Sequence, residues 1–297
     1  MKKNKIQSFI ILIVLSLIWG TSFILIKKGL IGYPPNQVGA LRIVLAALVF
    51  IPYAIKNFRK LDFHLYKYIL AFALLELGIP PFLYSYAQTV VNSSTAGILN
   101  SLVPLFTLLI GFIVYKVPTN KFKVLGVMIG LLGAILLVFF KTGDFTTVDF
   151  ANSWGLLIVL ATLMYGLGSN ILKEYLQDIS DMDITSIAFI SMGIPAFFYL
   201  LTTDFFHITF THPNAPTAFG SIALLSVFGS ALAIFLFAKL VKKSNALFAS
   251  FVTYLIPFVS MLWGLLDGEG ITPIQILSML MILSGIYIAN LTITSKQ

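Results

Sequence analysis

Two apolar segments of the chain carry the same pattern of small, hydroxyl-bearing and proline residues. Residues 92–111 and 245–264 superpose without a gap at an offset of 153, which pairs Asn92 with Asn245 and Pro104 with Pro257. In each segment the patterned residues recur at spacings of three or four and therefore share one helical face. The first set is Gly97, Asn100, Pro104, Thr107 and Gly111, and the second is Ser250, Thr253, Pro257, Ser260 and Gly264.

These two faces are suited to binding a polar solute within apolar surroundings. A polar side chain that faces lipid is costly, so it usually turns toward a cavity or a neighbouring helix. We expect both faces to line one central cavity, with Pro104 and Pro257 as hinges, because each proline frees a backbone carbonyl. The expected binding residues on these faces are Asn100, Thr107, Thr253 and Ser260. The alternative is that small and hydroxyl residues only allow close helix contact, which is common in membranes.

Two charged residues stand inside apolar segments. Glu76 is about nine residues from the nearer end of its segment, or ~13 Å along a helix, and an intramembrane acid is a functional candidate by default. We expect Glu76 to hold a coupling proton or attract a cationic group; a protonated or paired structural carboxyl is the alternative. Arg42 is the candidate for a charge at the outer mouth of the cavity that clamps a carboxylate. Its alternative is an anchor that reaches the lipid headgroups.

Aromatic and small polar residues of other segments add to the candidate site. Trp19 and Tyr165 fall near the middle of their segments, where an interfacial aromatic belt does not explain them. An aromatic-lined pocket could stack on a ring or shield an apolar group; core packing is the equal alternative. The further expected binding residues are Trp19, Thr21, Ser22, Tyr84, Tyr165, Asn170 and Tyr254.

The elements that must position these residues are ten apolar segments, each about long enough to cross a bilayer. They are residues 8–27, 36–55, 68–90, 94–115, 121–140, 153–173, 184–203, 217–239, 245–266 and 272–292. Of 297 residues, 59% are hydrophobic and 10% charged, and the mean hydropathy is +0.98. Too little polar sequence remains to cover a water-soluble domain of this size. The predicted fold class is an all-α membrane protein with ten transmembrane helices.

The basic residues between the segments predict the orientation. Fifteen lie on or near the side that holds the N-terminus and three on the other, so this side and both termini are expected in the cytoplasm. Five segments in each half mean that the second half enters the membrane from the opposite side, as two inverted five-helix repeats do. We expect a first repeat at 1–141, a connecting outer loop at 142–152 and a second repeat at 153–297.

The chain resembles the EamA-type permeases of the drug/metabolite transporter superfamily over its whole length. The resemblance rests on WGTSF at 19–23, Pro34-Pro35 followed by Leu41-Arg42, STAGILNSLVPLFTLLIG in the fourth segment, and ASFVTYLIPFVSMLWG with the following Gly268-Glu269 and Thr272-Pro273. It implies a bacterial inner-membrane protein of ten helices in two inverted repeats, and many such proteins export amino acids or other small metabolites.

The chain departs from this family at two places. Many members have Glu before the proline of the fourth and ninth helices, where this chain has Val103 and Ile256. The first-half counterpart of Gly268-Glu269 is also missing, because that connection reads KVPTNK. A mechanism that relies on those carboxylates is therefore not carried over.

An enzyme is the main competing class, and the sequence lacks the metal-binding and catalytic motifs that an intramembrane enzyme is expected to have. His64, His207 and His212 fall in connections without metal-ligand spacing, and no H-E-x-x-H or phosphate-binding loop occurs. We expect no catalytic residue, no metal and no cofactor. The expected partners are a small-molecule substrate and the lipid bilayer, without nucleic acid; a homodimer is left open.

The resulting functional prediction is a secondary transporter of small amino-acid-like or related metabolites across the bacterial inner membrane. It is expected to act as an exporter or exchanger by alternating access. A lipid or isoprenoid-phosphate flippase is the alternative carrier, and an intramembrane enzyme is the less favoured class.

Overall fold

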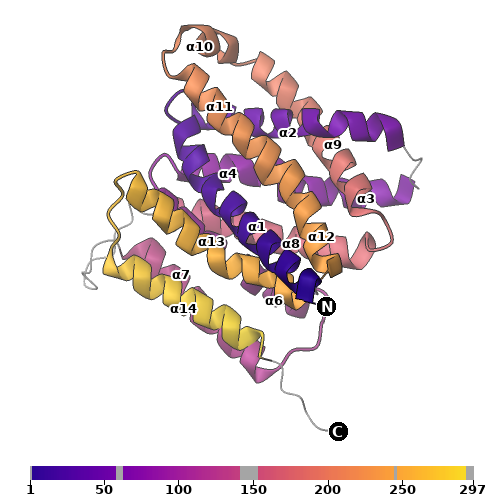
Figure 1. Ribbon diagram of the computed structural model, residues 1–297, viewed down its shortest axis with the longest axis vertical. Coiled ribbons are helices and arrows are strands. Elements are labelled where there is room, and N and C mark those ends of the chain that lie inside the picture. The colour runs from indigo at the N-terminus through magenta and orange to yellow at the C-terminus, as the bar shows by residue number, and fades with distance from the viewer. Residues whose placement is uncertain (1, 58–62, 141–152, 244–245, 292–297) are drawn as a thin grey trace.

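The computed structural model describes residues 2–57, 63–140, 153–243 and 246–291, and the long elements within these ranges are helices (Figure 1). In chain order they are α1 (Lys2–Gly29), α2 (Pro35–Asn57), α3 (Phe63–Ala73), η1 (Leu74–Gly78), α4 (Pro80–Ala87), α5 (Ser93–Asn100), α6 (Val103–Ile113), α7 (Lys121–Phe139), α8 (Gly155–Tyr175), α9 (Asp181–Leu201), α10 (Phe205–Thr211), α11 (Ala215–Ser226), η3 (Val227–Leu232), α12 (Ala233–Lys243), α13 (Ala246–Leu266) and α14 (Pro273–Ala289). The symbols η1 and η3 denote π-helical segments. The expected connecting loop at 142–152 lies outside the described residues.

Seven helical stretches in the described part of the chain are long and apolar enough to cross a membrane, and three shorter apolar helices accompany them. Large apolar side chains such as Phe9, Phe112 and Leu266 lie exposed on the outside of the bundle. Extensive apolar surface of this kind is suited to lipid rather than to water. The prediction of an all-helical membrane protein is confirmed, and the number of ten spans stays a prediction.

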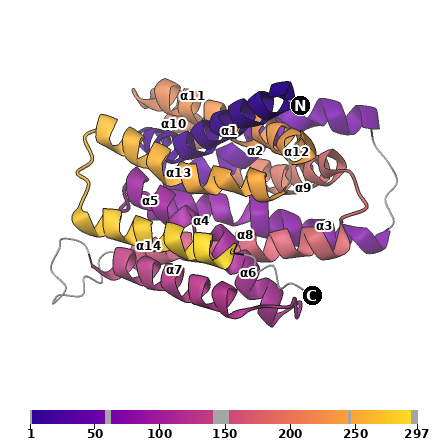
Figure 2. The same ribbon diagram turned by 60° about the horizontal axis from the view of Figure 1, so that its bottom comes forward.

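The helices run between two ends of the bundle, where the connections lie (Figure 2). We call one the Glu269 end; it holds the connections at 30–34, 88–92, 202–214 and 267–272. We call the opposite one the Lys173 end; it holds the connections at 114–120 and 176–180. The short helix α10, which the sequence did not predict, belongs to the Glu269 end.

The main helix contacts join the first half of the chain to the second in a symmetric pattern. α2 packs on α9, the second helix of each half, and α7 packs on α14, the last helix of each half. α1 of the first half packs on α13 of the second half. With the roles of the two halves exchanged, the equivalent contact joins α6 to α8. Figure 1 shows α7 beside α14 at one side of the bundle. Exchanging the two halves leaves this set of contacts unchanged, which is what two related repeats require.

Both halves interrupt their third helix with a π-helical segment at the same place. η1 contains Glu76 and η3 contains Gly229, and these residues are related by the offset of 153 that also relates Asn92 to Asn245. A π-helical segment holds one extra residue per turn and is frequently found at functional sites. The backbone therefore departs from the α-helix at two equivalent positions of the fold.

The fourth span expected at 94–115 corresponds to one apolar stretch, Ser93–Ile113, and a turn at residues 101–102 interrupts its α-helix. α5 ends at Asn100, a turn follows, and α6 begins at Val103 with Pro104 in its first turn. Proline has no N–H to donate to the carbonyl four residues earlier, so the helix restarts at this point. Pro257, its partner in the second half, lies inside the unbroken helix α13.

Glycines bring α7 and α14 into backbone contact. A Cβ atom on Gly126 would lie 2.6 Å from the backbone nitrogen of Ala289, and one on Gly285 would lie 2.8 Å from the nitrogen of Gly130. The G-x-x-x-G motif at Gly126 and Gly130 thus packs against the chain's own last helix, since only glycine leaves room for so close an approach.

Gly126→Ala should lower the free energy of unfolding by about 1–3 kcal/mol, because an added methyl group in a packed interface forces the backbones apart. The matched control is Gly220→Ala in α11, where a Cβ atom meets nothing within 4 Å. Thermal unfolding of the purified protein in detergent compares the two. Equal melting temperatures for both variants would contradict the described α7–α14 contact.

Candidate functional site

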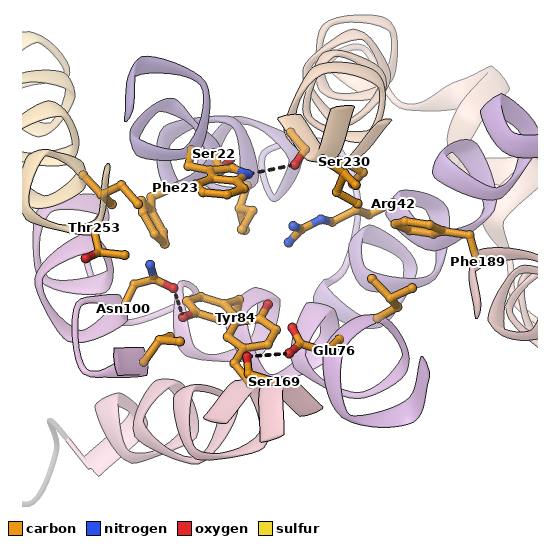
Figure 3. Close-up of a pocket in the computed structure, with 18 residues that line it drawn as sticks. Ser22, Phe23, Arg42, Glu76, Tyr84, Asn100, Ser169, Phe189, Ser230 and Thr253 are labelled. Carbon is orange, nitrogen blue, oxygen red and sulfur yellow. Dashed lines mark hydrogen bonds between the residues drawn. The ribbon is translucent and has the colours of Figure 1, made fainter. Parts of the chain in front are cut away.

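A cavity of about 270 Å³ lies at the centre of the bundle (Figure 3). Both halves of the chain line it, and within the described residues the last helix of each half, α7 or α14, adds no lining side chain. We call it the central cavity. The residues that line it are Trp19, Ser22, Phe23, Ile26, Arg42, Glu76, Leu77, Tyr84, Asn100, Val103, Tyr165, Ser169, Phe189, Gly229, Ser230, Ile234, Thr253 and Ile256.

Glu76 enters the central cavity from the π-helical segment η1. Ser169 of α8 donates a hydrogen bond to its Oε1 over 3.3 Å. Gly168 of the same helix makes room for the carboxylate, since a Cβ atom there would lie 2.7 Å from Oε1. The carboxylate therefore sits against α8 with one side-chain donor, and its remaining acceptor capacity is open to a ligand or a proton.

Arg42 of α2 points its guanidinium into the same cavity (Figure 3). The described ion pairs join Lys27 or Lys28 to acidic partners, and none of them includes Arg42 or Glu76. A basic and an acidic side chain thus line one small space without direct pairing. Because a guanidinium binds a carboxylate through two parallel hydrogen bonds, Arg42 is suited to an anionic group of a ligand.

Hydrogen bonds and aromatic contacts fix the remaining walls of the central cavity. The hydroxyl of Tyr84 donates to Asn100 Oδ1 over 2.7 Å, and Trp19 Nε1 donates to the carbonyl of Gly229 over 3.1 Å. The ring of Tyr84 stacks on that of Tyr165 with centroids 6.2 Å apart and lies 5.9 Å from that of Phe23. Side chains held in this way keep their orientation before a ligand arrives, which lowers the entropy cost of binding.

The lining residues occur in pairs related by the internal repeat. At the offset of 153 the pairs are Glu76 with Gly229, Leu77 with Ser230, Asn100 with Thr253, and Val103 with Ile256. The framework of the site is thus symmetric, whereas its chemistry is not. The first half supplies a carboxylate where the second supplies a glycine.

The structure brings together eight of the residues predicted for the site. These are Trp19, Ser22, Arg42, Glu76, Tyr84, Asn100, Tyr165 and Thr253. Gly229, Ser230, Ser169 and Phe189 also line the cavity and were not among the predicted set. The internal offset of 153 applied to Glu76 would have found Gly229.

The other predicted binding residues lie away from the central cavity. Thr21 accepts a hydrogen bond from Trp263, Tyr254 accepts one from Asn290, and buried Ser260 donates to the carbonyl of Pro257. Thr107 and Asn170 line a separate pocket of about 100 Å³ toward the Lys173 end. Their part in binding, and that of Pro104 and Pro257 as hinges, stays a prediction.

The separate pocket shares Ser169 with the central cavity. Asn170 Nδ2 donates to the carbonyls of Thr107 and Gly166, and Lys123 and Lys173 line the same pocket. Ser169 therefore stands between the central cavity and a basic opening at the Lys173 end. Within the described ranges, no group of three or more His, Cys, Asp or Glu side chains could hold a metal ion.

At the Glu269 end, an ion cluster joins α1 to the connection between α13 and α14. Lys27 Nζ lies 2.8 Å from Asp267 Oδ2 and 2.8 Å from Glu269 Oε1, and Lys28 pairs with Asp267. The hydrogen bonds from Lys27 and Lys28 hold the pKa of Asp267 below its ordinary value. Burial acts to raise the pKa of Glu269, but hydrogen bonds from Lys27, Ser93 and Ser94 outweigh it and lower the pKa.

Paired helical repeats around a polar cavity are a common architecture of membrane transporters. The model of the EamA-like transporter family matches residues 7–139 and 152–291. The chain therefore belongs to the EamA-like transporter family.

Related proteins agree with this class. The chain is 24% identical over 285 residues to the uncharacterized inner membrane transporter YedA of Escherichia coli, with 94% of this chain and 89% of YedA covered. It is 23% identical over 284 residues to an uncharacterized transporter of Archaeoglobus fulgidus, covering 95% of this chain and 98% of that one. An S-adenosylmethionine/S-adenosylhomocysteine transporter of Chlamydia muridarum is 24% identical over 270 residues, with 86% and 83% covered. A solved crystal structure shares the fold with a TM-score of 0.63 at 15% identity, covering 95% of this chain and 96% of that one.

Asp267→Asn should lower the melting temperature at neutral pH, and the difference should vanish in acid. The folded pKa of Asp267 lies below its ordinary value of 3.8. The carboxylate therefore adds stability above the unfolded pKa and loses it as pH falls through the folded one. Thermal unfolding between about pH 7 and pH 3 measures this, with exposed Asp178→Asn as the control. A loss of stability that does not change with pH would contradict the ion cluster.

Proposed function

We propose that this protein is a secondary transporter of a small amino-acid-like metabolite, which binds in the central cavity and crosses by alternating access. The observation that carries the proposal is the arrangement of Arg42 and Glu76. Both line one cavity without pairing directly, among side chains that donate and accept hydrogen bonds. A ligand with a carboxylate and an ammonium group would satisfy both charges at once.

The size and lining of the central cavity support a small substrate. Its volume of about 270 Å³ lies near the lower limit of ligand pockets, which measure about 300–1,000 Å³. Trp19, Phe23 and Tyr165 offer ring faces for an apolar or aromatic side chain, and Asn100 and Thr253 offer further polar contacts. The cavity favours a free metabolite over the long chain of a lipid, although a lipid phosphate stays the alternative carrier substrate.

The relative from Chlamydia muridarum adds one candidate within the same class. It is named as a transporter of S-adenosylmethionine and S-adenosylhomocysteine, and both molecules carry an amino-acid group. Arg42 and Glu76 could hold that group while the aromatic walls receive the rest. These two compounds therefore belong in any substrate screen of this protein.

Basic residues in the connections support an orientation in the membrane, and Glu76 supports a mode of energy coupling. We place the Lys173 end in the cytoplasm, because the connections on that side carry the excess of basic residues. Both termini are then cytoplasmic, and the protein is an exporter or exchanger of the inner membrane. The Glu76 carboxylate can bind either a proton or an ammonium group but not both, so proton entry could be exchanged for substrate exit.

A thermal-shift screen should find a zwitterionic ligand. An amino acid at 100 times its Kd raises the free energy of unfolding by about 2.7 kcal/mol, whereas its des-amino acid and its decarboxylated amine should give much smaller shifts. Asn100→Ala and Thr253→Ala should reduce the shift. Ser284→Ala, an exposed change in α14, is the control. Stabilisation by an isoprenoid phosphate alone would favour the flippase and overturn the proposal.

Glu76→Gln should separate proton coupling from substrate passage. In proteoliposomes, an imposed pH gradient should drive uptake by the native protein but not by the variant, because the amide cannot carry a proton. Substrate counterflow should persist with a raised KM, since Arg42 and Asn100 remain. Glu174→Gln, at the exposed end of α8, is the matched control. Unchanged pH-driven uptake by Glu76→Gln would exclude the coupling role.

A further inference from the structure

We infer that Glu269 is a positioning residue that holds the short helix α5, and with it Asn100, so that the central cavity stays closed toward the Glu269 end. This inference goes beyond the proposed function, since it concerns which end of the cavity is sealed and by which group. It rests on the contacts of one buried carboxylate.

Four hydrogen bonds from two helices converge on that carboxylate. Oε1 accepts from Lys27 Nζ over 2.8 Å and from the backbone N–H of Ser93 over 3.0 Å. Oε2 accepts from the backbone N–H of Ser94 over 3.1 Å and from its hydroxyl over 2.9 Å. The side chain of Glu269 is only 5% exposed. It therefore joins α1, the first turn of α5 and the connection before α14 in one enclosed contact.

The helix that Glu269 holds leads directly into the central cavity. α5 has only eight residues, with Ser93 and Ser94 in its first turn and Asn100 at its end. Eight residues of α-helix span about 12 Å. The turn before Pro104 separates α5 from α6, so α5 can move without the rest of the fourth span. A displacement of its first turn would be transmitted to Asn100 and to the hydrogen bond that Asn100 accepts from Tyr84.

The part of α1 between the central cavity and the ion cluster also contacts the connection that precedes α5. The carbonyl of Phe23 accepts a hydrogen bond from Gln88 Nε2 over 2.9 Å. Ile26 is the last residue of α1 that lines the cavity, and Lys27 follows it directly. Opening the cavity at this end therefore requires separating Lys27 from Glu269, which would remove the only described cation that pairs with this buried carboxylate.

In the described part of the chain, the position at the Lys173 end that is equivalent to Glu269 carries no carboxylate. Gly264, before Glu269, corresponds to Gly111 at the offset of 153, and both turns that follow contain a residue with positive φ, Gly268 and Lys116. The next residue is Glu269 in the second half and Val117 in the first. Val117 supplies no charge, so this position does not contribute to an ionic closure at the Lys173 end. The two closures of the cavity differ in chemistry, and the ionic one holds the Glu269 end.

Labelling of a single cysteine tests this closure. The chain has no cysteine, so Ile26→Cys provides one reporter in the cavity wall. In oriented membrane vesicles a membrane-impermeant maleimide applied from the Glu269 end should label it slowly. Adding Glu269→Gln should raise the labelling rate at least tenfold from that end alone. Adding Lys27→Met should raise it less, because the amides of Ser93 and Ser94 would still bind the carboxylate.

Glu174→Gln on the same reporter background is the control, because this exposed residue lies at the Lys173 end. Gel filtration and circular dichroism identify the variants that are folded. An unchanged labelling rate in folded Glu269→Gln, or equal rates for Glu269→Gln and Lys27→Met, would overturn the inference. Labelling needs no substrate, so its failure is distinguishable from a failure of the proposed transport function.

Discussion

A backbone that crosses an apolar layer must satisfy its own hydrogen bonds, and the architecture of this protein follows from that constraint. It explains why the long described elements are helices and why the departures from the α-helix are confined to the interior. Residues of the two π-helical segments line the central cavity, as do Asn100 and Val103 on either side of the turn before Pro104. Irregular backbone is tolerated where protein or a polar cavity surrounds it. The same places are thereby available to bind a solute.

The two halves of the chain build a symmetric framework and fill it with different chemistry. Both halves line the cavity, and each half packs its last helix, α7 or α14, against the other half. Single positions then break the equivalence. The second half has a glycine at the position equivalent to Glu76, and the first half has Val117 at the position equivalent to Glu269. The first difference gives the cavity one carboxylate wall, and the second gives it one ionic closure. A carrier with identical halves would have no physical basis for distinguishing the two ends of its substrate or the two sides of its membrane.

The sequence predicted the helices, the internal repeat and much of the cavity, because these depend on hydropathy and short-range spacing. Asn100 and Thr253 were found since they occupy equivalent places near the two prolines. Thr107 was assigned to the same face as Asn100 because the helical period was extended through Pro104, where the real helix restarts. Thr21 and Ser260 are polar residues inside spans, but their directions depend on helix rotation, which tertiary packing decides. The contact between Lys27 and Glu269 joins residues 242 positions apart, and no local pattern indicates it.

The matched π-helical segments also contain a record of the chain's ancestry. Both halves carry the π-helical segment at the same place, with Glu76 and Gly229 at equivalent positions. If the halves had acquired the segment independently, the same change would have had to arise twice at equivalent places. The segment is therefore most simply an inheritance from a single ancestral half, present before gene duplication. Such an ancestor, assembled as two copies in opposite orientations, would have had two identical cavity walls, and the later divergence of one wall from the other gave the present site its polarity.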